Sequence, residues 1–249
     1  VAKFLETVHR QDIPIGIGPA QNDKWGPQAA WVIDYDLQSF PGCIHKNGIQ
    51  ALIETIHANP GIKLIVIGPM TNIGAALEQD ASIQHHASVI AMAGSVYEGY
   101  NGNATPAEEY NVVQDIKACH QVFAAAWPIT ITPLDTCGKV VLRGDAYQKV
   151  LHSILPIPQA IIENYEIWAF SHSKTNFQNE SSVLFDTVAI YLAISAAFLE
   201  FEDLHLEINQ RGVMIVGNKG KMTRCAVRWR DIDDFYTWLV NRLAYSMKK

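Results

Sequence analysis

Amide and carboxylate side chains gather between Asn103 and Asn111, after a Gly94-Ser-Val-Tyr97 turn that ends an apolar run. Asn103, Glu109 and Asn111 together offer amide donors and carboxylate acceptors. Glu109 and Asn111 are two residues apart, so we expect them to share one side of an extended segment. The vicinal hydroxyl groups of a sugar need such a mixture. Taken alone, the stretch also fits a polar surface loop in which Asn and Pro form turns.

The elements that must position this segment alternate between apolar strands and helices. Strands are expected at residues 12–18, 62–67, 88–92 and 129–132. Helices are expected at residues 1–9, 47–57, 72–78 and 114–126. Residues 19–45 have no steady period, which indicates a long loop. The alternation predicts an α/β fold, with an open, mostly parallel, Rossmann-like sheet and helices on both faces.

The second half of the chain has a different pattern. Helices are expected at residues 145–154, 158–173, 185–197 and 233–246. Between the last two of them, residues 205–208, 213–216 and 223–229 have the pattern of edge strands joined by hairpins. The sequence therefore predicts an antiparallel addition to the parallel sheet.

Composition limits the class of protein. With 249 residues, 49% of them hydrophobic, the chain is long enough for one α/β domain over residues 1–249. The net charge of −6 without a basic block argues against nucleic acid and anionic membranes as partners and favours a small molecule. No apolar run approaches the roughly 20 residues of a membrane span, and the start lacks a signal-peptide pattern. The four cysteines show no disulfide or zinc spacing, which favours reduced thiols and a cytoplasmic location.

Five segments occur in an order that resembles the inosine-uridine preferring nucleoside hydrolase family. They are Ile67-Gly-Pro-Met-Thr-Asn-Ile73, Met92-Ala-Gly-Ser-Val96, Gly102-Asn-Ala-Thr-Pro-Ala-Glu-Glu-Tyr-Asn111 with Asp115, Pro133-Leu-Asp135 and Leu184-Phe-Asp186. Each segment alone is weak, because Gly-Pro after a strand is ordinary turn chemistry. The resemblance covers most of the chain and implies hydrolysis of the N-glycosidic bond of ribonucleosides to ribose and free base. It also implies a homo-oligomer, a dimer or a tetramer.

The resemblance implies a Ca²⁺ cofactor, an ion that prefers oxygen ligands. By motif, the Asp186 carboxylate and the backbone carbonyl of Ile67 would be metal ligands. Asn103, Glu109 and Asn111 would hold the ribose hydroxyl groups, and Met92 would pack beneath the sugar. Asp186 has a competing interpretation as the N-cap of the helix that follows it. Asp135 is interpreted as structural support near the edge of the sheet.

The chain departs from the family pattern at its N-terminus. The family's Asp-rich loop after the first strand supplies the general base and most calcium carboxylates, and no such loop is in place here. We therefore expect an N-terminally incomplete domain that lacks the first strand and leaves the catalytic base unassigned. Two acidic runs do not replace the loop: Asp231-Ile-Asp-Asp234 has the pattern of a helix start, and Asp34-Tyr-Asp36 lies in the long loop.

A second departure concerns the leaving base. Many family members have a His just before the residue that matches Asp186, and this chain has Phe185. Aromatic stacking is an alternative way to activate a leaving purine. The candidates are Phe185, Trp25, Trp31, Tyr165 and Trp168. For the tryptophans and the tyrosine, ordinary packing is at least as good an interpretation.

The incomplete pattern leaves three functional alternatives. The chain is part of a nucleoside hydrolase with impaired turnover, or an inactive relative that binds a nucleoside or ribose or assists an intact partner subunit. The third alternative, a different sugar-binding α/β protein, requires the order of the five segments to be accidental. A missing central strand would expose apolar faces and unpaired backbone. We therefore expect residues 1–249 alone to be unstable or to aggregate, and a soluble, cooperatively melting monomer would contradict this.

Overall fold

The computed structural model describes residues 1–19 and 26–245, which form two compact units. Unit 1 contains residues 1–48, 141–182 and 233–249, and unit 2 contains residues 49–140 and 183–232. Each unit is built from segments that are distant in the sequence. The single-domain prediction, including its incomplete N-terminus, stays a prediction.

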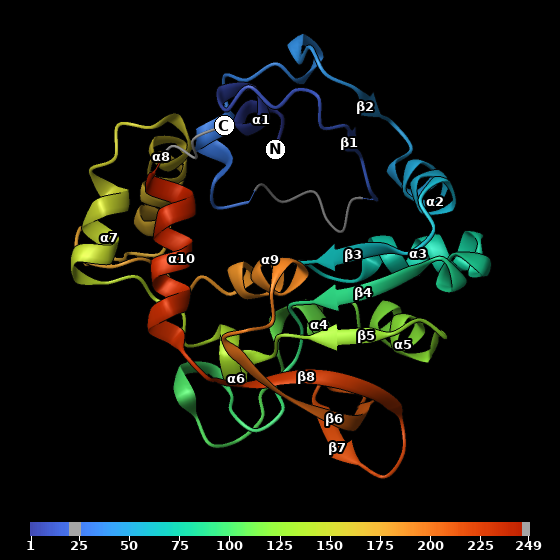
Figure 1. Ribbon diagram of the computed structural model, residues 1–249. Coiled ribbons are helices and arrows are strands. Elements are labelled where there is room, and N and C mark those ends of the chain that lie inside the picture. Colours follow the sequence, from blue (N-terminus) through green and yellow to red (C-terminus); the bar gives the residue numbers. More distant parts are fainter. Residues whose placement is uncertain (20–25, 246–249) are drawn as a thin grey trace. The chain divides into compact units, whose positions relative to one another are not determined.

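Unit 2 contains a six-stranded sheet with the strand order β3-β4-β5-β8-β6-β7 (Figure 1). The strands are β3 (Ile62–Val66), β4 (Ala87–Ala91), β5 (Ile129–Ile131), β6 (Leu199–Ile208), β7 (Met214–Gly217) and β8 (Lys221–Trp229). The first four strands of that order pair in parallel, whereas β6 is antiparallel to both β7 and β8. The predicted mostly parallel α/β sheet is confirmed.

One prediction about this sheet is wrong. Residues 223–229 were expected as an edge strand, but β8 lies between β5 and β6. The reason is visible in its burial: Thr223, Cys225, Ala226 and Val227 are all buried, so this strand is covered on both faces. The strand expected at residues 205–208 is also longer than predicted, because β6 begins at Leu199 rather than His205.

Helices cover both faces of the sheet. The helices α2 (Gly48–Ala58), α3 (Thr71–Gln79) and α5 (Ile116–Ala124) place Ile56, Ala76 and Val122 in the same core as the strand residues Leu64, Val89 and Ile131. The helix α9 (Asp186–Ile194) packs on β3 and β4 from the opposite face, where the Lys63 ammonium group donates to the Ala193 carbonyl. The short helices α4 (Tyr110–Gln114) and α6 (Leu134–Cys137), together with the 3-10 turns η3 (Ala81–His85) and η4 (Tyr100–Gly102), connect these layers.

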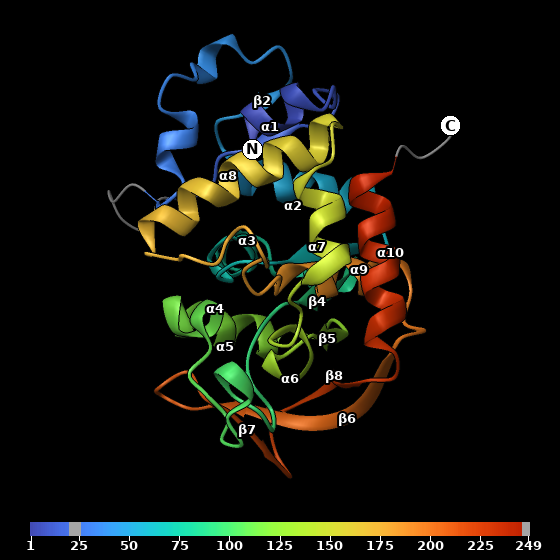
Figure 2. The ribbon, with the colours of Figure 1, turned by 90° about the vertical axis from the view of Figure 1, so that its left-hand side faces the viewer.

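Unit 1 is mainly helical, with α1 (Ala2–Thr7), α7 (Gly144–Leu151), α8 (Pro156–Ser171) and α10 (Ile232–Ala244). Pro156 occupies the first turn of α8, where its fixed φ angle suits a helix start. Figure 2 shows α7 and α10 side by side, and Asp233 and Asp234 lie in the first turn of α10 as the sequence predicted. The expected 19–45 loop contains the 3-10 turns η1 (Ala29–Val32) and η2 (Leu37–Ser39) and the strand β2 (Ile44–His45).

The first predicted strand is much shorter than expected. Only Ile15 and Gly16 form β1, which pairs in parallel with β2. Gly16 lies so close to the Gly48 backbone that an added Cβ would approach the Gly48 Cα to 2.9 Å. This close packing is a local reason for glycine at the position. In the described residues, no helix has the length and apolarity needed to cross a membrane.

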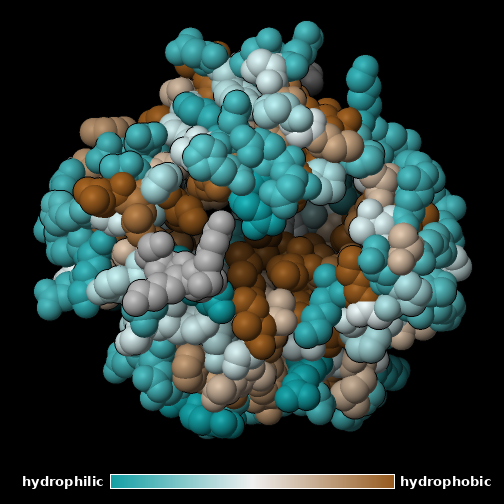
Figure 3. Space-filling view, turned by 45° about the horizontal axis from the view of Figure 1, so that its top comes forward, coloured by the Kyte–Doolittle hydropathy of each residue, from teal (hydrophilic) through white to brown (hydrophobic). Residues whose placement is uncertain are grey.

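The strand β3 is at one end of the sheet, and within residues 1–19 and 26–245 it pairs only with β4. Ile65 and Ile67 are each 42% exposed there. Figure 3 shows the general surface pattern, in which hydrophilic side chains cover most of the visible face and hydrophobic ones gather in part of it. An apolar strand with an unpaired edge is a template for association with another chain.

We therefore predict that Ile65→Lys reduces self-association of the isolated chain, because a charge on an edge strand opposes strand pairing. Analytical ultracentrifugation over a concentration series measures the effect. Met222→Lys is the control, since Met222 is 50% exposed but β8 has partners on both sides. Equal effects of the two substitutions, or a wild-type chain that remains monomeric, would contradict the prediction.

Candidate functional site

The carboxyl ends of three neighbouring parallel strands meet at one edge of the unit 2 sheet. Val66 pairs with Ala91, and Ala91 pairs with Ile131, so β3, β4 and β5 end at the same level. Adjacent strands are about 4.8 Å apart. The chain therefore brings Ile67, Met92 and the segment after Ile131 together, which is where open α/β sheets bind their ligands.

Glu109 is buried at this edge, with 1% of its surface exposed. It is the N-cap of α4. Its Oε1 accepts a hydrogen bond from the Asn111 backbone N–H at 2.9 Å, and its Oε2 accepts from the N–H groups of Gly94 at 3.1 Å and Val112 at 3.2 Å. The expectation of an extended segment through Glu109 and Asn111 is wrong, because a helix begins here and the carboxylate satisfies its first N–H groups.

Asn111 and Met92 are joined directly. The Asn111 Nδ2 donates to the Met92 carbonyl at 3.0 Å and lies 3.1 Å from the Met92 sulfur. Met92 is 3% exposed and Asn111 is 7% exposed. In the part of the chain that the structure describes, no hydrogen bond to the Asn111 Oδ1 is present, which leaves this acceptor for a ligand hydroxyl group.

Gly94 forms the sharp turn after β4. Its φ angle of 77° is in the left-handed region, and an added Cβ would collide with the Met214 sulfur. Glycine is therefore required both by the backbone conformation and by the space. The turn directs the Gly94 N–H toward Glu109, so a strand end and a helix start share one carboxylate.

Asn103 lies apart from this buried group. It is exposed, and its Oδ1 accepts from the Thr105 backbone N–H at 3.2 Å. Its carbonyl also accepts from the Gly99 N–H at 2.8 Å. These contacts are those of a turn-forming residue, the alternative that the sequence left open for this stretch.

Asp186 is the first residue of α9. The N-cap of that helix is Phe185, and no side chain makes a capping hydrogen bond there, so the capping interpretation of Asp186 is wrong. Burial raises the pKa of Asp186 to about 6. Burial also raises the pKa of Glu109, and the charge of Asp186 raises this pKa further. The three backbone hydrogen bonds to the carboxylate act in the opposite direction and lower it. The two carboxylates thus act on the same low-dielectric region.

Cys137 lies in that region and has no exposed surface. Burial raises the pKa of its thiol well above the usual value, and the charges of Glu109, Asp186 and Asp135 add to this effect. The thiol therefore stays protonated.

The Ile67 carbonyl follows β3, and no hydrogen bond to it is present among the described residues. In residues 1–19 and 26–245, no group of three or more His, Cys, Asp or Glu side chains is arranged to hold a metal ion.

The aromatic candidates fall into separate groups. The Phe185 ring meets the Tyr100 ring edge to face, with centroids 6.2 Å apart in unit 2. In unit 1, Tyr165 stacks on Trp168 with centroids 5.9 Å apart, and the Trp31 indole N–H donates to Glu163 at 3.3 Å. Trp25 lies outside the described residues.

The sequence analysis missed Tyr100 and Ser95. The Tyr100 hydroxyl oxygen accepts from the Tyr110 backbone N–H at 2.9 Å, next to Glu109. The Ser95 hydroxyl, which is on a fully buried residue, accepts from the Ala107 N–H at 2.9 Å and donates to the Glu98 carbonyl at 2.7 Å. Both follow glycine-containing turns, but single Tyr and Ser residues in turns carry no distinctive signal.

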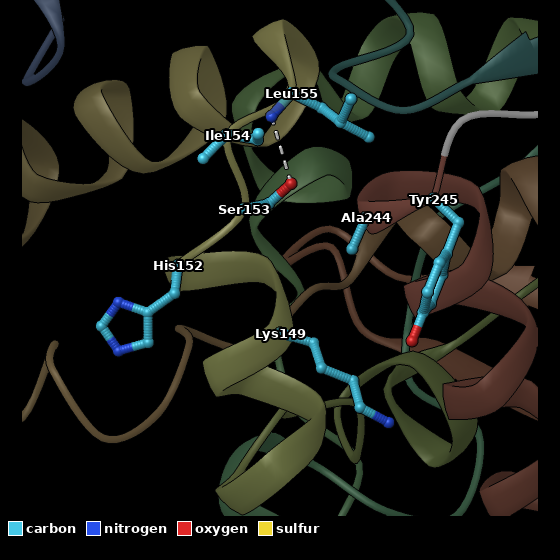
Figure 4. A pocket seen from close by; sticks show the side chains of 7 residues that line it. All are labelled: Lys149, His152, Ser153, Ile154, Leu155, Ala244 and Tyr245. Carbon is cyan, nitrogen blue, oxygen red and sulfur yellow. Dashed lines mark hydrogen bonds between the residues drawn. The ribbon is translucent and has the colours of Figure 1, made fainter.

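Unit 1 contains a cavity of about 410 Å³ (Figure 4). It is lined by Lys149, His152, Ser153, Ile154, Leu155, Ala244 and Tyr245. The lining has no carboxylate or side-chain amide, and in Figure 4 the Lys149 and His152 side chains do not converge on a common point. The cavity therefore lacks the donor and acceptor mixture of the strand-end group, and none of the predicted site residues lines it.

Residues 1–237 match the family described as inosine-uridine preferring nucleoside hydrolase. The chain belongs to this family. The resemblance drawn from five short segments is confirmed, and family membership indicates a hydrolase that acts on N-glycosyl bonds.

Two relatives are similar to this chain at 25% identity. One is the Arabidopsis thaliana protein described as "Probable uridine nucleosidase 2", over 92% of this chain and 75% of that protein. The other is the inosine-uridine preferring nucleoside hydrolase of Leishmania major, over 80% of this chain and 65% of that protein. The chain spans about half to three quarters of the length of the curated relatives it matches.

The fold is shared with solved structures. A plant nucleoside hydrolase, the PpNRh1 enzyme, superposes with a TM-score of 0.80 at 18% identity. The superposition covers 97% of this chain and 84% of the plant enzyme's chain. A purine-preferring ribonucleoside hydrolase from Gardnerella vaginalis superposes with a TM-score of 0.72, also at 18% identity, over 92% of this chain and 78% of its own. At these identities the superpositions establish the family's fold for the present chain.

We predict that Asp186→Asn stabilises the metal-free protein at pH 7.5 more than at pH 4. Folding raises the pKa of Asp186 from about 3.9 in an unfolded chain to about 6. The protonated acid contributes fully to the free energy of unfolding below pH 4, and this contribution is lost as the pH rises through 6. The amide of the variant stays neutral, so the variant does not lose stability in this way.

The measurement is the melting temperature of both proteins between pH 4 and pH 7.5 in the presence of a chelator. Asp203→Asn, which removes a carboxylate from an exposed position on β6, controls for the change in net charge. A difference between wild type and Asp186→Asn that does not depend on pH would contradict the assignment.

Proposed function

We propose that this chain binds the ribose part of ribonucleosides at the strand-end group of unit 2 and hydrolyses the N-glycosidic bond, giving ribose and free base. The observation that carries the proposal is the Asn111 carboxamide, which is held on Met92 by its Nδ2 and keeps its Oδ1 for a ligand next to the buried Glu109. Family membership supports the reaction class.

In this proposal, Asn111 and Glu109 accept hydrogen bonds from ribose hydroxyl groups, and Met92 packs beneath the sugar. Three of the roughly four acceptor positions on the Glu109 carboxylate are used by backbone N–H groups, so one position remains for a hydroxyl donor. Asn103 is a weaker candidate, because it is exposed and its Oδ1 already has a partner.

The carboxylates also suit the expected transition state. Cleavage of an N-glycosidic bond develops positive charge on the sugar, which is then attacked by water. Negative side chains fixed in a region of low dielectric stabilise such charge more strongly than water does. Glu109 and Asp186 meet this requirement, since Glu109 is buried, Asp186 is partly buried, and neither pairs with a cationic side chain among the residues that the structure describes.

For the leaving base, we propose that Phe185 and Tyr100 form an aromatic contact. Their rings already pack together, and Phe185 directly precedes Asp186. Trp25, Trp31, Tyr165 and Trp168 stay candidates for the same role.

We propose calcium as the cofactor, with the Asp186 carboxylate and the Ile67 carbonyl as two of its ligands. Asp186 is partly buried and its carboxylate makes no capping hydrogen bond, and the Ile67 carbonyl has no partner in the described residues, so both oxygens suit a hard cation. Two oxygens are nevertheless far fewer than the six to eight that calcium takes. The described ligand set therefore does not complete a calcium site.

A cytoplasmic location and assembly into a homo-oligomer belong to the same proposal. The four cysteines are free, and three of them are buried. Free thiols are typical of a reducing compartment.

We predict that Glu109→Gln lowers kcat/KM for ribonucleosides by about 100-fold, the effect of losing one fixed hydrogen-bonding group in an active site. A ribose-release assay with several nucleosides measures it. Glu108→Gln is the matched control, because Glu108 is exposed and pairs with Arg211.

Three outcomes of this assay, combined with a calorimetric measurement of nucleoside binding, separate the alternatives. Hydrolysis by wild type with a specific loss in Glu109→Gln supports the proposal. Binding of nucleosides without hydrolysis supports the inactive-relative alternative. Neither binding nor hydrolysis by wild type would show that the proposed function is wrong.

We predict that millimolar calcium chloride raises the melting temperature of wild type at pH 7.5, because a ligand of the folded state stabilises it by mass action. A chelator reverses the shift, and Asp186→Asn abolishes it. Differential scanning fluorimetry measures all three conditions. Equal calcium responses of wild type and Asp186→Asn would exclude Asp186 as a ligand.

A further inference from the structure

Asp135 holds the loop that follows β4. It is 1% exposed and belongs to α6, just after β5. Its Oδ1 accepts from the backbone N–H groups of Tyr97 at 2.7 Å and Glu98 at 3.2 Å, and its Oδ2 accepts from the Val96 N–H at 2.9 Å. Three successive N–H groups that converge on one acceptor form a concave anion-binding arrangement. Here the occupant is a side chain of the protein itself.

The other end of the same loop is bound to the candidate ribose site. The Gly94 N–H donates to Glu109, and the Gly94 carbonyl accepts from the Leu134 N–H at 2.9 Å. Ser95 connects the loop to Ala107, two residues before Glu109. The loop from Gly94 to Glu98 is therefore fixed between two buried carboxylates, Glu109 on one side and Asp135 on the other.

The position of Glu109 depends on this loop. One of its three N–H donors, that of Gly94, comes from the loop, whereas the other two come from the start of α4. If the loop moves, the Gly94 N–H moves with it, and the carboxylate is then held only by its own helix. The orientation of the oxygen that remains for a ligand would change as a result.

We propose that Asp135 is a positioning residue for ribose binding, which acts through the Gly94–Glu98 loop on Glu109. This inference rests on the proposed function of the strand-end group. Asp135 itself touches no substrate. Its carboxylate suits the role because it has no N–H of its own, so both oxygens accept from the loop.

The test compares Asp135→Asn with Thr136→Val in the full chain. The asparagine side chain has only one acceptor oxygen, so either the Val96 N–H or the pair from Tyr97 and Glu98 faces an NH₂ group. Thr136 is the next residue in α6 and is also fully buried, but its hydroxyl donates to Ala226 on β8 and not to the loop. Both substitutions remove a buried hydrogen bond, but only Asp135→Asn releases the Gly94–Glu98 loop.

We expect Asp135→Asn to raise the KM for ribonucleosides and the Ki for free ribose about tenfold, which corresponds to one lost hydrogen bond. Amide hydrogen exchange at residues 96–98 should accelerate in the same variant. Thr136→Val should lower thermal stability but leave KM, Ki and this exchange unchanged. Ser95→Ala, which removes the link to Ala107, should raise KM in the same direction, and it decides the test if Asp135→Asn does not fold.

The outcomes distinguish this inference from the function on which it rests. A wild-type chain that neither binds nor hydrolyses nucleosides overturns the proposed function and the inference together. An active wild type, with Asp135→Asn and Ser95→Ala equal to Thr136→Val in KM and Ki, overturns the inference alone.

Discussion

The buried carboxylate of Glu109 has to be compensated by hydrogen bonds, and the geometry of the site depends on how this is done. An isolated buried charge is costly, and backbone N–H groups at a helix start need acceptors. Glu109 meets both needs at once by accepting from Gly94, Asn111 and Val112. Because these donors come from two segments, the carboxylate connects the end of β4 to the start of α4. Asn111 is thereby held next to Met92.

The sheet supplies the frame for this connection. Parallel strands that end at the same level bring Ile67, Met92 and the region of Asp135 to one edge, although they are far apart in the sequence. Asp186, Glu109 and Asp135 all raise the pKa of the buried Cys137, which shows that their negative charges converge on one interior region. Such a concentration of fixed negative charge is suited to a cation or to a sugar that becomes positive.

The departure at Phe185 belongs to the same arrangement. An aromatic ring at this position packs on Tyr100, whose hydroxyl in turn receives the Tyr110 N–H beside Glu109. The residue that precedes Asp186 is thus part of the packing around the carboxylates. A phenylalanine side chain cannot donate a proton, so at this position it contributes packing and stacking only.

The sequence by itself determined the alternation of strands and helices, the mostly parallel sheet and the family, because periodicity and short ordered motifs are local signals. It also selected Met92, Glu109 and Asn111, but it gave Glu109 and Asn111 an extended backbone, since a five-residue helix is too short to show a period. Only the tertiary structure decided that Asp186 does not cap α9, that β8 is an interior strand and that Asp135 binds the loop after β4. The position of β8 and the role of Asp135 depend on partners that are distant in the sequence. Val96 and Asp135, for example, are 39 residues apart, and such long-range contacts leave no trace in local composition.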